Sequence, residues 1–159
     1  IRPFKIDYEN SDYVSEEDHE EIIKRCFPEY EDVLYTNIGV NLGTAALNTV
    51  DYLFSMKNVA LIKYRREVLR GRYLESLLNN KNMKSEIIRL ASLGGAQQFL
   101  SLAQIRDLKI PIPPVNLQFK FGEIIDKIET QKRLTLESIQ KSEELFQSLL
   151  QRAFKGGLV

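Results

Sequence analysis

The sequence has one cysteine, one histidine and no tryptophan among its 159 residues. A single cysteine, Cys26, excludes an internal disulfide framework and a cysteine-based metal cluster. His19 stands alone, which excludes a zinc site built on a histidine pair and leaves little for acid–base catalysis near neutral pH. No apolar run approaches the roughly 20 residues of a membrane-spanning helix, and no secretory signal is visible. The sequence therefore predicts a cytoplasmic protein without a metal.

Motifs of catalysis are also missing. The sequence contains no G-x-x-x-x-G-K-[ST] loop, no G-x-G-x-x-G and no Gly-x-Ser-x-Gly. The only histidine near Cys26 is His19, within a charged stretch, and a buried or neutral cysteine is much more common than a nucleophilic one. The paired carboxylates of residues 16–21 lie in a polar helical run and are interpreted as solvated surface. The sequence thus indicates a binding module and not an enzyme.

The net charge is zero, but acidic and basic residues are concentrated in different parts of the chain. Residues 1–32 carry 4 basic and 11 acidic residues, whereas residues 57–89 carry 9 basic and 3 acidic ones. A basic segment within a neutral chain can form a cationic face for a polyanion, because each neutralised phosphate releases counterions. The alternative is a solvated helix face with its loops.

The length and the hydrophobic content of the chain are sufficient for one ordinary domain with an appendage. The chain has a mass of 18.4 kDa, and 43% of its residues are hydrophobic. Ile1 in place of methionine indicates a fragment or a processed chain. For the first ~115 residues the patterns predict an α+β domain with short elements. The expected helices are 16–27, 73–78 and 84–91; the expected strands or extended segments are 33–36, 44–50, 58–64, 99–102 and 108–112.

The last part of the chain predicts one long helix. Residues 118–155 contain no proline and a single glycine, Gly122. Such a helix is about 57 Å long at roughly 1.5 Å per residue. Alternate steps of four and three residues define a heptad seam, which predicts a coiled coil with a second helix from another copy or from a partner; the alternative is packing onto the same domain. The apolar seam residues are Phe121, Ile125, Ile128, Ile139, Phe146, Leu149 and Ala153, interrupted by Lys132, Thr135 and Ser142.

Several segments resemble the specificity subunit of Type I restriction–modification systems, over nearly the whole chain from about Asp32. They include Tyr73-Leu-Glu-Ser-Leu-Leu, Gly94-Gly-Ala-Gln-Gln-Phe-Leu-Ser-Leu and, above all, Ile110-Pro-Ile-Pro-Pro-Val-Asn-Leu-Gln before the long helix. Their order matches one repeat of that family: a target recognition domain at 1–116, a spacer helix at 117–155 and a tail at 156–159. A complete subunit has two repeats, so the chain is expected to be a C-terminal half, a natural half-subunit or a trimmed chain.

The resemblance implies a non-catalytic subunit that reads one half of a bipartite target in double-stranded DNA. Methyltransferase subunits would dock on it and supply S-adenosylmethionine chemistry, so the chain itself needs no cofactor, and the restriction subunit would join through the complex. The spacer helix would form an antiparallel coiled coil with the spacer helix of the other repeat and set the distance between half-sites. With a single repeat, two copies of the chain would form a homodimer through that helix. The alternative is a coiled-coil adaptor whose globular part binds a protein and not DNA.

Candidate DNA-contacting residues are chosen by chemistry, because the resemblance supplies none. Arginine and asparagine suit bidentate contacts to guanine and adenine edges, and basic residues suit phosphates. For Asn37 and Asn41 singly, turn chemistry is the favoured alternative, and Gln97 and Gln98 are interpreted as part of a structural turn. The candidates are polar residues expected to be exposed in loops after strands: Asn37, Asn41, Thr44, Asn48, Lys63, Tyr64, Arg65, Arg66, Arg70 and Arg72.

Overall fold

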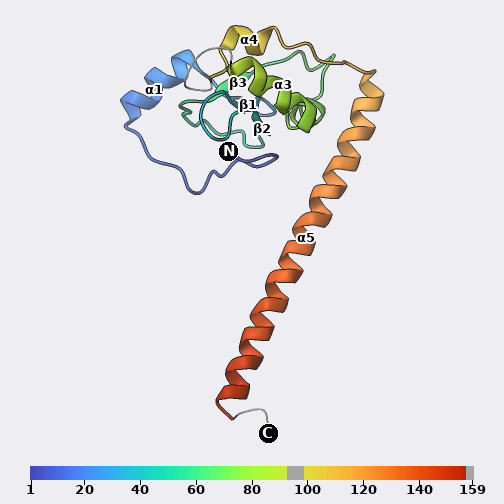
Figure 1. Ribbon diagram of the computed structural model, residues 1–159. Helices are drawn as coiled ribbons and strands as arrows, with labels where there is room; N and C mark the ends of the chain where they lie inside the picture. Colours follow the sequence, from blue (N-terminus) through green and yellow to red (C-terminus); the bar gives the residue numbers. More distant parts are fainter. Residues whose placement is uncertain (93–98, 157–159) are drawn as a thin grey trace. The chain divides into compact units, whose positions relative to one another are not determined.

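A computed structural model of the chain describes residues 1–92 and 99–156 (Figure 1). The chain divides into two compact units, Ile1–Phe119 and Lys120–Val159. The first unit is a small mixed domain of helices and strands, and the second consists of most of one long helix. This confirms the predicted fold class. Gln97 and Gln98 lie outside the described residues.

The sheet of the first unit has three antiparallel strands in the order β2-β1-β3. They are β1 (Val33–Thr36), β2 (Thr44–Leu47) and β3 (Ala60–Ile62). Leu34 of the central strand pairs with Ala46 on one side and with Leu61 on the other. The strands predicted at 33–36, 44–50 and 58–64 are present, but β2 and β3 are shorter than expected. At Asn58 the backbone turns into the left-handed region, with φ of 60°, so β3 cannot begin there.

Three of the four short helices follow the predicted pattern. In α1 (Glu16–Arg25) the hydroxyl of Ser15 accepts a hydrogen bond from Asp18 N at 3.2 Å, which confirms the expected start. The helix ends at Arg25, two residues before the predicted end and ahead of the proline at position 28. α2 (Gly71–Leu78) and α3 (Lys81–Ser92) each begin two or three residues earlier than expected.

The chain between α3 and the long helix differs from the prediction. An extended segment was expected at 99–102, but α4 (Leu102–Arg106) begins at its last residue. The helix starts there because Ser101 and Gln104 make a reciprocal capping box. No strand forms within residues 107–114. Leu108 and Ile110 pack against the core without ladder bonds. Proline at 111, 113 and 114 removes three backbone donors from this segment, so the predicted edge strand is wrong.

Helix α2 seals the β2 edge of the sheet with side chains. The amide of Asn79 donates to Ala45 O at 2.8 Å and accepts from Ala45 N at 3.1 Å. The carboxylate of Glu75, which is fully buried, accepts from Leu47 N at 2.8 Å. These bonds replace those that a fourth strand would make, so the edge offers no ladder to another chain.

The long helix α5 (Val115–Phe154) has 40 residues. It begins three residues before the predicted start, directly after the proline pair, and ends within one residue of the predicted end. Along the heptad seam Ile128, Ile139 and Phe146 are exposed in the single chain. Pairing of this seam with a second helix stays a prediction. Within residues 1–92 and 99–156, neither α5 nor any other helix is long and apolar enough to span a membrane.

The start of α2 depends on a glycine. A methyl group at Gly71 would overlap the hydroxyl of Tyr64 and a terminal methyl of Leu47. The hydroxyl of Tyr64 donates to Glu31 O at 2.8 Å, so it has little room to move. The absence of a side chain at Gly71 therefore allows α2 to approach β2 and the Tyr64 ring.

We expect Gly71→Ala to lower the free energy of unfolding by about 1–3 kcal/mol, because overpacking forces neighbouring side chains and backbone to shift. Denaturant unfolding followed by circular dichroism measures the change. Asn82→Ala is the matched control, since Asn82 is exposed on α3 and should change stability by no more than about 0.5 kcal/mol. Equal stability of Gly71→Ala and wild type would contradict the packing described.

Candidate nucleic-acid interface

The ten candidate residues do not form one surface. The strand register places Val33 of β1 beside Leu47 and Ile62, so the chain on either side of this end carries Asn48 and Lys63. At the other end Thr36 pairs with Thr44, next to the turn that contains Asn41. The candidates are therefore divided between the two ends of the sheet, and the basic ones gather at the first end.

Of the three candidate residues at the hairpin end of the sheet, Asn41 is exposed and the other two are buried. Asn37 is buried, and its amide donates to Leu100 O at 3.1 Å, which ties the end of β1 to the chain after α3. Thr44 is also buried, and its hydroxyl accepts from Lys84 Nζ at 3.3 Å. The expectation that Asn37 and Thr44 are exposed is wrong, because both satisfy polar groups at the sheet. Whether any of the three contacts DNA stays a prediction.

Asn48 serves the other end of the sheet from a buried position. Its side-chain oxygen accepts from Tyr8 Oη at 2.7 Å, and its amide donates to Glu29 O at 2.9 Å. Only 1% of the residue is exposed. The expectation of an exposed Asn48 is also wrong: its side chain joins the N-terminal segment and the turn before β1 to the end of β2.

The acidic N-terminal segment and the basic middle of the chain meet at Asp32. This carboxylate is 3% exposed and lies 2.7 Å from Lys63 Nζ and 3.7 Å from the Arg66 guanidinium. Lys63 also lies 2.5 Å from Glu29 Oε2. Although burial lowers the pKa of Lys63, its hydrogen bonds to the two carboxylates outweigh this and raise it above the ordinary value. The same hydrogen bond to Lys63 lowers the pKa of Glu29.

Arg70 and Arg72 are held by contacts inside the domain. The Arg70 guanidinium lies over the ring of Phe119, 4.1 Å from its centre. Arg72 Nη1 lies 2.7 Å from Glu75 Oε2. Tyr64 is more than half buried, and burial raises its pKa to about 12. The sequence thus predicted a cluster of four arginines, but within it only Arg65 and Arg66 are exposed.

Residues 63–70 are called the basic turn below. Its exposed side chains border a hollow whose described lining carries three cations and three carboxylates: Lys63, Arg65 and Arg66 with Glu29, Asp32 and Glu67. In the described part of the chain, Arg65 makes no ion pair, whereas Lys63 and Arg66 share Asp32. Arg65 is therefore the arginine of this surface best placed to meet a phosphate or a base edge without first leaving a carboxylate.

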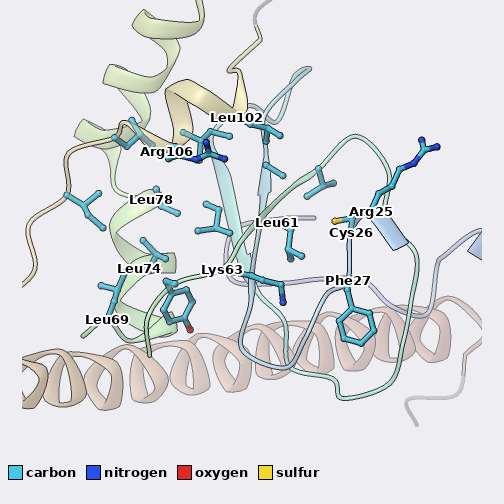
Figure 2. Close-up of a pocket in the computed structure, with 17 residues that line it drawn as sticks. Arg25, Cys26, Phe27, Leu61, Lys63, Leu69, Leu74, Leu78, Leu102 and Arg106 are labelled. Carbon is cyan, nitrogen blue, oxygen red and sulfur yellow. The ribbon is translucent and has the colours of Figure 1, made fainter. Parts of the chain in front are cut away.

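A second hollow lies beside β3 and is apolar (Figure 2). Leu61, Leu74 and Leu102 line it, with Cys26 on the side of α1 and Lys63 at its border with the basic turn. Burial raises the pKa of the Cys26 thiol, so at neutral pH the sulfur is a weak nucleophile. Within the described residues, no group of three or more histidine, cysteine, aspartate or glutamate side chains could hold a metal ion.

The sequence prediction missed three polar residues that organise the site. Asp32 is the shared partner of the cations, Glu75 joins Arg72 to β2, and Gln118 is 1% exposed. A signal existed for Glu75: it lies on the same helix face as Leu74 and Leu78, where a carboxylate must be paired when buried. No comparable pattern marked Asp32, because its burial depends on chain segments about thirty residues away.

A comparison with known protein families matches this chain to a family model. The family model described as "Type I restriction modification DNA specificity domain" matches residues 5–147. The match covers well over half of the chain and extends from the first unit far into α5. It agrees with the resemblance carried by the sequence motifs.

Lys63→Met should lower the free energy of unfolding by about 1–3 kcal/mol at neutral pH, because Asp32 would lose its nearest cation while remaining buried. The lowered pKa of Glu29 means that its pairing stabilises the fold above the ordinary pKa of glutamate and is lost as the pH falls through the lowered value. The raised pKa of Lys63 means that its contribution is complete below the ordinary pKa of lysine and is lost as the pH rises through the raised value.

The stability difference between wild type and Lys63→Met should therefore be greatest between roughly pH 4.3 and 10.4, the ordinary pKa values of the two groups, and shrink on both sides. Denaturant unfolding across this range measures it. Lys57→Met is the control, since Lys57 is exposed. A difference that stays constant with pH would show that the ion pairs contribute nothing to folding.

Proposed function

The chain belongs to the family of Type I restriction-modification DNA specificity domains, and on that premise we propose that it is a non-catalytic subunit reading one half of a bipartite DNA target. The observation that carries the proposal is the match over residues 5–147, which includes both the mixed domain and most of the long helix. We assign residues 1–116 to target recognition, 117–155 to the spacer helix and 156–159 to a tail.

The basic turn supports a specific mode of contact. Arg65 and Arg66 would hold a phosphate or the edge of a guanine, with Lys63 on the backbone beside them. At the hairpin end the exposed Asn41 would supply a second contact. The six remaining candidates, Asn37, Thr44, Asn48, Tyr64, Arg70 and Arg72, would serve by fixing the backbone from which these side chains extend.

The reaction itself would belong to partner subunits. Methyltransferase subunits would dock on the recognition domain and the spacer helix and bind S-adenosylmethionine, and the restriction subunit would join through that complex in the cytoplasm. Since the hollow at the basic turn carries equal numbers of cations and carboxylates, a protein-binding adaptor is the competing function. The two differ in salt dependence, because DNA binding weakens steeply as salt rises.

Replacing Arg65 and Arg66 by glutamine should weaken DNA binding and lower the slope of log affinity against log salt by up to about 2, roughly one per lost phosphate contact. Gel shifts or fluorescence anisotropy at several salt concentrations, with a duplex selected from a random library, measure both quantities. Arg106→Gln with Lys109→Gln is the matched control, as both residues are exposed and lie outside the basic turn. Unchanged affinity and slope in the Arg65/Arg66 variant would favour the adaptor.

The spacer helix needs a partner for its seam. Each buried isoleucine, leucine or phenylalanine gains roughly 1.5–3 kcal/mol relative to exposure. In one chain Ile128, Ile139, Phe146 and Leu149 are exposed along a single stripe. With one repeat, we propose that two copies pair their helices in antiparallel orientation, which brings Phe121 of one copy near Ala153 of the other and places the polar middle of the seam against itself.

Light scattering should show a dimer for wild type and a monomer for Ile128→Asp with Ile139→Asp, because both substitutions place carboxylates in the seam. Thr130→Asp with Gln140→Asp is the control: it adds the same charge on the opposite face and should leave the dimer intact. In a Cys26→Ser background that also carries Phe121→Cys and Ala153→Cys, a disulfide between position 121 of one copy and position 153 of the other supports antiparallel pairing. A monomeric wild type, or a disulfide between two copies of position 121, would overturn it.

A further inference from the structure

The Pro-Pro-x-x-x-Gln motif ends in a glutamine that has no role in the function proposed so far. Gln118 lies in the first turns of α5, within the Ile1–Phe119 unit, and only 1% of it is exposed. A buried glutamine must have hydrogen-bond partners, since an unpaired buried amide is costly. Its partners show what the motif holds in place.

The side-chain amide of Gln118 makes three hydrogen bonds to backbone groups. Its oxygen accepts from Arg70 N at 2.9 Å, and its nitrogen donates to Val68 O at 2.9 Å and to Pro113 O at 2.8 Å. The amide thus pairs with the carbonyl and the N–H of residues two apart, as the backbone of a neighbouring strand would. Its second donor binds the proline motif itself, so one side chain joins the basic turn to the start of α5.

The basic turn is fixed from inside as well. The carbonyl of Arg65 accepts from Val68 N at 3.1 Å and from Leu69 N at 3.0 Å. Arg70 is the N-cap of α2 and receives no cap from its own side chain, so Gln118 satisfies a backbone donor that this helix start leaves open. The Arg70 guanidinium over Phe119 adds a second contact between the same two segments. Of the three arginines in the basic turn, Arg65 and Arg66 have exposed side chains.

We propose that Gln118 is a positioning residue for DNA reading: it holds the backbone of the basic turn so that Arg65 and Arg66 meet base edges in a fixed geometry. This rests on the proposed contact between the basic turn and DNA. Non-specific binding depends on charge and tolerates a displaced turn, whereas a bidentate base contact does not. Gln118 should therefore affect discrimination between sequences more than affinity for DNA in general.

The chemistry of the site separates glutamine from its closest replacements. Methionine has a similar length but offers neither the acceptor for Arg70 N nor the donors for Val68 O and Pro113 O. An ionised glutamate keeps the acceptor and loses both donors. A protonated glutamate regains one donor, and burial raises the pKa of such a carboxyl toward neutrality. Gln118→Glu should therefore recover part of the function as the pH is lowered.

The experiment measures the full chain with two duplexes, one selected from a random library in the presence of the methyltransferase subunit and one scrambled. Gln118→Met should reduce the ratio of the two affinities by about tenfold, within the discrimination that one bidentate contact supplies, and leave the scrambled-duplex affinity and salt slope within about twofold. Gln118→Glu should match it at pH 7.5 and regain part of the ratio at pH 5.5. Gln131→Met, on the exposed part of α5, is the control and should change nothing.

Amide hydrogen exchange without DNA tests the positioning directly. Exchange at Arg70 should be at least tenfold faster in Gln118→Met, and exchange at Leu78 in the same helix should be unchanged. Unchanged exchange at Arg70, or an intact affinity ratio in Gln118→Met, would overturn the proposal. So would global unfolding of both variants at both pH values, because Gln118 would then serve the whole fold.

If wild type fails to discriminate between the duplexes, the proposed function fails, and the exchange rates still decide whether Gln118 holds the turn.

Discussion

The ion pairs of the buried Asp32 carboxylate are the interaction on which the first unit, Ile1–Phe119, depends. Two cations from the chain after β3 hold this carboxylate, at 2.7 Å for Lys63 and 3.7 Å for Arg66. Its Oδ2 also accepts a hydrogen bond from Glu29 N at 2.8 Å, which fixes the turn before β1. A buried charge without a partner is strongly destabilising, so the acidic and basic segments cannot separate while the domain stays folded. This pairing brings Arg65 and Arg66 to one end of the sheet, and the carboxylates there partly neutralise Lys63 and Arg66.

If it binds DNA as proposed, a surface built this way would attract DNA differently from a uniformly basic one. The overall charge is zero, and the hollow at the basic turn has balanced charges, so long-range steering is weak. Contacts then depend on where individual side chains lie, and a rigid backbone matters more than the number of cations. Hydrogen bonds between backbone groups and the side chains of Asn48, Glu75 and Gln118 supply that rigidity around the site. Such a surface favours discrimination between sequences over strong non-specific binding.

Local sequence patterns predicted most helices and strands, whereas long-range packing decided which polar side chains are buried. Strands β1 to β3, the start of α1 and the long helix follow from residue type and spacing, because those signals act within a few residues. Burial of Asn37, Thr44 and Asn48 could not be predicted, because their partners are distant or contributed by the backbone. Two wrong predictions could have been avoided from local sequence. Ser101 and Gln104 have the spacing of a capping box, which predicts the start of α4, and the prolines around Ile112 exclude the hydrogen-bond ladder of a strand.

Sealing of the β2 edge by α2 has a consequence for how the domain can vary. Glu75 and Asn79 act as substitutes for a strand, so their two side chains close most of the β2 edge. The exposed side chains of Asn41 and Arg65 lie outside this framework. If these two positions read DNA as proposed, new side chains there would change the target preference without reopening the β2 edge, so the domain could serve as a scaffold whose specificity changes while its stability stays the same.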